Sequence, residues 1–119
     1  MNAVLVFFGG GLGAILRFLA GRIALLLGWA PPIATLTVNI AGCLIMGVLA
    51  GWFIARGTAE PVRLFLLTGV LGGFTTFSAF GLDTLTLWQR GASSQAAAYV
   101  AASVIASLAA VALGFAIAR

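Results

Sequence analysis

Charge is scarce in this chain. Only 7% of its 119 residues are charged, and the basic residues are six arginines, with no lysine and no histidine. The acidic residues are Glu60 and Asp83. Catalysis that relies on histidine or on paired carboxylates therefore lacks its residues, and we expect no enzyme. With so small a net charge, +4, the arginines are expected to set the orientation of membrane spans and not to form a nucleic-acid-binding surface.

Cysteine and nucleotide-binding motifs are equally sparse. Cys43 is the only cysteine, which excludes an intrachain disulfide and a thiolate metal cluster. The sequence contains no Walker A motif, so this chain is not expected to drive transport with a nucleotide. No carboxylate falls within the first two apolar segments, where a proton-coupled cation exporter needs one.

Apolar residues dominate instead. They make up 63% of the chain, which has a mean hydropathy of +1.23. A water-soluble domain of this size has too little interior to bury so much apolar surface. Since a membrane span needs about 20 residues, the sequence predicts one all-α transmembrane domain over residues 1–119. Its four expected spans cover roughly residues 4–27, 33–55, 64–88 and 96–118.

The third of these spans is interrupted between Gly69 and Phe80. Three glycines, three hydroxyl side chains and three phenylalanines lie within these twelve positions. Glycine weakens a helix, and irregular backbone in a membrane survives only where protein buries it or where it lines a wet cavity. We therefore predict that the third helix is broken here and that the break is the functional site.

Polar side chains on the second and fourth spans have two open interpretations. Asn39 shares a helix face with Thr35 and Gly42, and Ser103 lies four residues from Ser107. Such groups either hydrogen-bond between helices or line a path for a solute. For Asn39, the second role is donation of an N–H to a passing anion.

Two phenylalanines suggest the same kind of path. Phe77 and Phe80 stand on one helix face, and the edge of an aromatic ring carries positive potential that suits a small anion. The alternative is packing against a neighbouring helix, which the spacing alone favours. Arg17 lies inside the first span and either reaches the headgroups or faces protein. Asp83 is expected to pair with an arginine near a helix end.

Three stretches together resemble the Fluc/CrcB family of fluoride channels. Residues 9–18, GGGLGAILRF, are similar to the family's G-G-x-x-G-A-x-x-R-Y/F start. Residues 35–42, TLTVNIAG, resemble its T-L-x-V-N-x-x-G stretch, and residues 72–80, GGFTTFSAF, resemble its G-G-x-T-T-F-S-T-F core. Their order and spacing match over essentially the whole chain. Ala79 stands where threonine is usual, Asp83 where glutamate is usual and Phe18 where tyrosine is usual.

The resemblance implies a passive, fluoride-selective channel that exports fluoride and lowers its cytoplasmic concentration. It implies a multi-pass protein in the lipid of a prokaryotic inner membrane that works as an antiparallel, dual-topology homodimer with two pores. It also implies a central structural sodium ion, Na+, held by the backbone carbonyls of Gly72 and Thr75. The residues that it places on the fluoride pathway are Asn39, Phe77, Phe80, Thr76, Ser78, Ser103 and Ser107.

Arginine placement is compatible with dual topology. If the spans alternate, Arg56, Arg63 and Arg119 lie on one side, and Arg90 lies on the other with Arg17 and Arg22 nearer to it. The positive-inside bias that fixes orientation is therefore weak. Two other functions remain open on the residues alone. One is a small dual-topology exporter of organic cations, and the other is a membrane assembly subunit without transport.

Overall fold

The computed structural model describes residues 1–119 and consists of helices joined by short turns. Four helical segments are long and apolar enough to cross a membrane. A helix of 25 residues covers about 38 Å at 1.5 Å per residue, more than the roughly 30 Å of hydrocarbon in a bilayer. The predicted all-α fold with four long apolar helices is thus confirmed. The segments are α1 (Asn2–Leu26), α2 (Pro31–Arg56), the bent segment Glu60–Gln89, and α6 (Ser93–Ala118).

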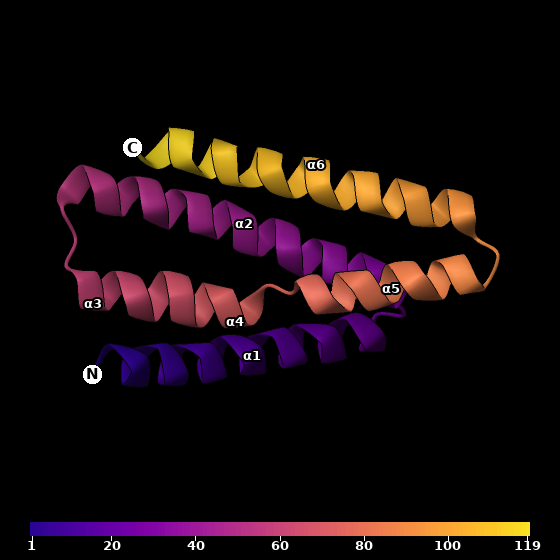
Figure 1. Cartoon of the computed structure of the whole chain (residues 1–119), viewed down its shortest axis with the longest axis horizontal. Coiled ribbons are helices and arrows are strands. Elements are labelled where there is room, and N and C mark those ends of the chain that lie inside the picture. Colours follow the sequence, from indigo (N-terminus) through magenta and orange to yellow (C-terminus); the bar gives the residue numbers. More distant parts are fainter.

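The third segment is bent and has four parts, which follow one another in Figure 1. They are α3 (Glu60–Arg63), the π-helix η1 (Leu64–Leu71), α4 (Gly72–Phe74) and α5 (Phe77–Gln89). Only Thr75 and Thr76 leave the helical conformation, with φ/ψ of −78/158° and −149/122°. The break is therefore narrower than the predicted stretch from Gly69 to Phe80. The sequence did not indicate η1, because a π-helix has no distinctive hydrophobic pattern.

Glycines let α2 and α6 touch backbone to backbone. A Cβ built on Gly47 would meet the Val111 carbonyl, and one on Gly51 would lie 2.8 Å from the Phe115 carbonyl. From the other side, a Cβ on Gly114 would meet the Leu44 carbonyl. Small residues permit such close approach in lipid, where packing drives helix association. This contact fixes α6 against α2 on the side that carries Asn39.

Glycines also bring α1 onto the first half of the bent segment. A Cβ on Gly13 would meet the Val70 carbonyl and lie 2.8 Å from the Phe74 nitrogen. A Cβ on Gly9 would lie 2.6 Å from the Phe65 carbonyl. Gly21, two helical turns beyond Gly13, has nothing within 4 Å. The close glycine contact is therefore confined to the first half of α1.

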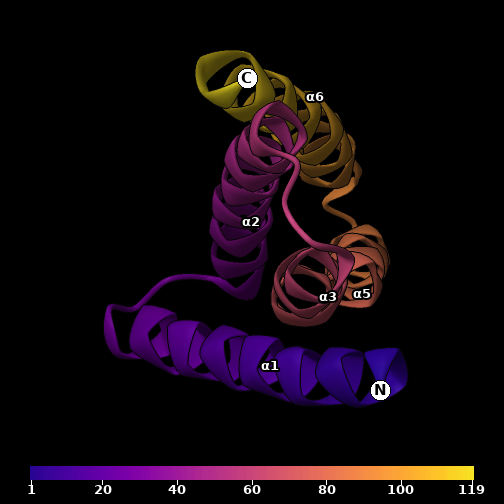
Figure 2. The same cartoon turned by 90° about the vertical axis from the view of Figure 1, so that its left-hand side faces the viewer.

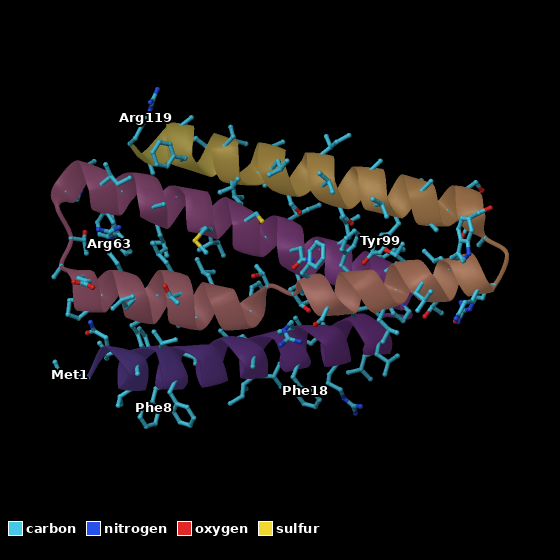
Figure 3. The ribbon with its side chains drawn as sticks, viewed as in Figure 1. Met1, Phe8, Phe18, Arg63, Tyr99 and Arg119 are labelled. Carbon is cyan, nitrogen blue, oxygen red and sulfur yellow. The ribbon has the colours of Figure 1, made fainter.

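The helices splay and do not form a parallel bundle. Figure 2 shows α1 crossing beneath the others at an angle, while α3 and α5 follow each other in depth. Both termini and the α2–α3 connection lie at one end, where Figure 3 shows Met1, Arg63 and Arg119. The remaining two turns lie at the other end. Sharp turns at Gly28, Gly57 and Gly91 have φ between 63° and 76°, which glycine adopts without strain.

The outer surface of the chain is apolar. Phe8 and Phe18 are both 63% exposed and point away from the other helices in Figure 3. The buried hydrophobic core is correspondingly small; its members are Ala24, Val38, Phe53, Leu71, Phe80, Ala96 and Tyr99. A chain with this inside-out distribution needs lipid or further protein around it.

Candidate functional site

Asn39 on α2 holds the break through its side-chain amide. Its Nδ2 donates to the Thr76 carbonyl at 2.9 Å, and its Oδ1 accepts from the Thr76 N–H at 2.8 Å. Both backbone groups of an extended residue inside an apolar segment are thereby satisfied. An amide has two N–H groups, so the second N–H of Asn39 is still available as a donor.

Side chains intercept hydrogen bonds that would otherwise continue the helix across the break. In an unbroken helix the Thr76 N–H would donate to Gly72 and the Ala79 N–H to Thr75. The Thr76 N–H donates instead to Asn39, and the Ala79 N–H donates to Thr76 Oγ1 at 3.1 Å. Thr76 is thus the N-cap of α5, a position that favours a hydroxyl side chain. The break is a hydrogen-bonded structure and not a local failure of the helix.

Arg17 reaches the same region from α1. It is half-buried, and its Nε donates to the Gly73 carbonyl at 3.1 Å. In an unbroken helix that carbonyl would accept from the Phe77 N–H. A cation at the C-terminal end of α4 also complements the helix dipole. Arg17 therefore faces protein and does not reach for the lipid headgroups, which was the alternative.

An open pocket of about 330 Å³ lies beside the break. We call it the break pocket. Helix α2 supplies Asn39 to its lining, α5 supplies Phe77 and Phe80, and α6 supplies Ser103 and Ser107. The pocket is thus assembled from three helices that are distant in sequence. Its full lining is Asn39, Cys43, Thr75, Thr76, Phe77, Phe80, Ser103, Val104, Ser107 and Leu108.

Ser103 contributes an unpaired hydroxyl to the break pocket. The residue is only 6% exposed, and its Oγ has no hydrogen-bond partner. Serine in a membrane helix commonly bonds to the carbonyl one turn earlier, as Thr84 does to Phe80 at 2.8 Å. A buried hydroxyl without a partner costs about 1–3 kcal/mol, and a hydrogen bond to a water or an anion in the break pocket would offset this cost.

The two phenylalanines of the break pocket differ in exposure. Phe80 is 9% exposed and Phe77 is 81% exposed, and their ring centroids lie 5.3 Å apart at an interplanar angle of 61°. Phe80 also lies 5.3 Å from the Tyr99 ring, at 52°. Inclined rings of this kind present edges as well as faces to the space between them.

Asp83 has a different partner from the arginine that we expected. The Tyr99 hydroxyl donates to Asp83 Oδ2 at 3.0 Å and links α6 to α5. Tyr99 lies one helical turn before Ser103 on the same face of α6. The prediction that Asp83 pairs with an arginine is wrong.

Most of the predicted pathway residues are brought together, but Ser78 is not among the pocket lining. It is exposed, and its Oγ lies 3.3 Å from Thr76 Oγ1. Three apolar or weakly polar lining residues, Cys43, Val104 and Leu108, were not predicted. Cys43 had a signal in the sequence, since it lies one turn after Asn39 on the same helix face.

The backbone carbonyls of Gly72 and Thr75 suit a hard cation. The two N–H groups that would bond to them in a helix are those taken by Asn39 and by Thr76 Oγ1. Gly72 is exposed on the surface of the single chain. The chain has no cluster of histidine, cysteine or acidic residues for a metal ion. Neutral carbonyl oxygens are ligands that sodium-like ions accept, so the residues present fit the implied ion.

Four membrane-length helices, an apolar exterior and a polar break inside one span define a multi-pass membrane protein. A family profile described as "CrcB-like protein, Camphor Resistance (CrcB)" matches residues 4–115. The chain belongs to this family.

Relatives over the full length carry the name "Fluoride-specific ion channel FluC". The protein from Methylobacterium sp. (strain 4-46) is 51% identical over 120 residues, covering 100% of this chain and 97% of the relative. The protein from Novosphingobium aromaticivorans is 50% identical and covers 96% and 93%. The protein from Paracoccus denitrificans (strain Pd 1222) is 52% identical and covers 96% and 91%. An ion channel is not an enzyme, which agrees with the missing catalytic residues.

Proposed function

We propose that this chain is a passive, fluoride-selective channel that carries fluoride out of a prokaryotic cell across its inner membrane. The observation that carries the proposal is the break pocket, in which the unpaired Ser103 hydroxyl lies with Asn39 and Phe77. An anion needs donors and positive ring edges there and no carboxylate. Neither Glu60 nor Asp83 lines the pocket.

Selectivity for fluoride follows from its size and hydration. Fluoride holds water tightly, so a path must replace that water with close hydrogen-bond donors. Hydroxyls on Ser103, Ser107 and Thr76 and the second N–H of Asn39 offer such donors. A larger anion fits a narrow, rigid lining less well.

Export needs no energy source of its own. A membrane potential of 100 mV, negative inside, favours the exit of one negative charge by about 2.3 kcal/mol. In acidic surroundings, fluoride enters a cell as neutral HF, which dissociates inside. The fluoride ion would then leave by this path.

The working unit in this proposal is an antiparallel, dual-topology homodimer with two pores. Phe77 is 81% exposed although it lines the break pocket, so the lining of one chain is open on that side. A second copy would close it. Arg56, Arg63 and Arg119 lie toward one end and Arg22 and Arg90 toward the other, which gives neither orientation a strong preference. The Gly72 and Thr75 carbonyls of the two copies would hold the sodium ion between them.

Ion efflux from liposomes tests the function. We would load vesicles with equal fluoride and chloride, reconstitute the purified protein, and follow both ions with selective electrodes. The proposal predicts rapid fluoride loss and chloride loss no faster than from empty vesicles. A folded dimer that moves neither ion would overturn the proposal, and proton-coupled uptake of organic cations would then be measured.

Substitution of Phe77 separates a channel from an assembly subunit. Phe77→Leu keeps an apolar side chain on an exposed position, so the chain should still fold and assemble. A pathway role predicts an intact dimer with lost fluoride efflux. A packing role predicts instead that the dimer itself is lost. Leu82→Ala, at an exposed position of the same helix outside the pocket, is the matched control.

A further inference from the structure

Four helical hydrogen bonds that would span the break are missing, and three of them have a named cause. The bonds that would join Gly72 to Thr76 and Thr75 to Ala79 are intercepted by Asn39 and by the Thr76 hydroxyl. The bond that would join Gly73 to Phe77 lies between these two. The Gly73 carbonyl accepts a hydrogen bond from Arg17 Nε instead. Arg17 is the one of the three that comes from α1.

We propose that Arg17 is a positioning residue for the anion path. By donating to the Gly73 carbonyl, Arg17 keeps the third span broken. If that carbonyl were released, the Phe77 N–H could bond to it and draw α5 into line with α4. Phe77 and Thr76 would then leave their places in the break pocket. This inference rests on the proposed function for its link to fluoride, but the geometry of the break stands on its own.

The packing of α1 places Arg17 within hydrogen-bond reach of the Gly73 carbonyl. Gly13 lies one helical turn before Arg17 and lets α1 touch the backbone at Val70 and Phe74. A Cβ on Gly73 would meet the Gly10 carbonyl, so α1 also touches α4 itself. The close glycine contact therefore delivers the guanidinium to the end of α4 at a fixed height.

Arg17 lines a recess of about 100 Å³ together with Thr35, Thr76 and Ala79. Thr76 lines both this recess and the break pocket. Arg17 and the anion path thus lie on two sides of the same extended residue, and displacement of Arg17 acts on the path through Thr76 and not through contact with the anion.

A set of substitutions separates a hydrogen-bonding role from a charge role. In glutamine the Nε2 donor follows Cδ as Nε does in arginine, so Arg17→Gln keeps a donor near the same place and removes the charge. In methionine the terminal methyl carbon takes that place, so Arg17→Met has the same reach with neither donor nor charge. Arg17→Lys keeps the charge and moves the donor one atom further out. Arg22→Met, at an exposed arginine of α1, is the control.

Hydrogen exchange of peptides covering residues 74–80 gives a readout that does not depend on transport. A charge-assisted hydrogen bond shifts an equilibrium by roughly ten- to a hundredfold, so Arg17→Met should slow exchange at the Phe77 amide, which gains the Gly73 carbonyl as its acceptor, by that order. Fluoride efflux should fall with it. Arg17→Gln should stay within about threefold of the unaltered protein in both measurements.

Other results would overturn the inference. Unchanged exchange in Arg17→Met would show that Arg17 does not hold the break. Equal loss of efflux in the glutamine and methionine variants, with normal efflux in Arg17→Lys and unchanged exchange, would show that Arg17 acts through its charge. If the unaltered protein moves no fluoride, the proposed function fails, while the exchange data still decide whether Arg17 holds the break.

Discussion

Asn39 and Thr76 are joined by a pair of hydrogen bonds, one in each direction, 2.9 and 2.8 Å long. The amide thus takes the place of a neighbouring strand for a single extended residue. Because both backbone groups of Thr76 depend on one side chain, the shape of the break depends on it as well. Asn39 therefore links two interpretations that the sequence left separate, a bond between helices and a place on the path.

The Asn39–Thr76 pair predicts a joint loss of stability and transport. Asn39→Ala leaves two backbone groups unpaired, and we expect a loss of about 2–5 kcal/mol in the free energy of unfolding with efflux near background. Asn39→Asp keeps the acceptor for the Thr76 N–H but adds negative charge, so it should retain more stability than alanine and transport no better. Thermal unfolding in detergent and liposome efflux measure the two effects. Thr37→Ala, at an exposed position of α2, should change neither.

Ser103 predicts opposite signs for stability and transport. Because its buried hydroxyl has no partner within the chain, Ser103→Ala should leave the free energy of unfolding unchanged or raise it by up to about 1 kcal/mol. Fluoride efflux should fall, since a donor on the path is lost. Ser94→Ala, at the exposed start of α6, is the control for both measurements. A destabilised Ser103→Ala with normal efflux would assign the hydroxyl to helix packing.

Substitution of Phe80 should lower the free energy of unfolding much more than substitution of Phe77, although both substitutions should reduce fluoride efflux. Phe80 is buried between Phe77 and Tyr99, so Phe80→Ala should cost about 3–5 kcal/mol. Phe77→Ala should cost less than about 1 kcal/mol in a single chain, because its ring is largely exposed. The comparison is made under conditions that keep the chain monomeric, and efflux is measured separately. Equal destabilisation by the two substitutions would contradict the arrangement of the rings.

Gly13 and Gly11 predict opposite effects on the same helix. Gly13→Ala forces α1 away from Val70 and Phe74 and should cost about 2 kcal/mol or more. Gly11→Ala meets nothing within 4 Å and should gain up to about 1 kcal/mol from better helix propensity. Thermal unfolding of the monomeric chain measures both. If Gly11→Ala instead weakens self-association, that face of α1 lies in the contact between copies.

The sequence indicated the helices more fully than the contacts between them. Hydropathy revealed four long helices, and the glycines and threonines from Gly69 onward indicated a break in the third. The sequence singled out the polar residues that line the break pocket, because polar side chains in apolar helices are few, but it did not indicate the apolar lining residues Val104 and Leu108. Their partners were harder to predict, because a hydrogen bond between Asn39 and Thr76 depends on how α2 and α5 cross. The same reason explains why Asp83 was assigned an arginine while its actual partner is Tyr99.

The π-helix η1 has a consequence for the length of the chain. A one-residue insertion or deletion inside a membrane span normally rotates everything beyond it by about 100° and breaks its packing. Segment Leu64–Leu71 already winds more loosely than an α-helix, so the loss of one residue there could be absorbed by a return to α-helical winding. What could not be preserved is the register of Gly69 with Gly9, whose backbones approach too closely for a Cβ between them. Over evolutionary time, variation in length at η1 should therefore be accompanied by changes at Gly9, a covariation between two helices that share no polar bond at that point.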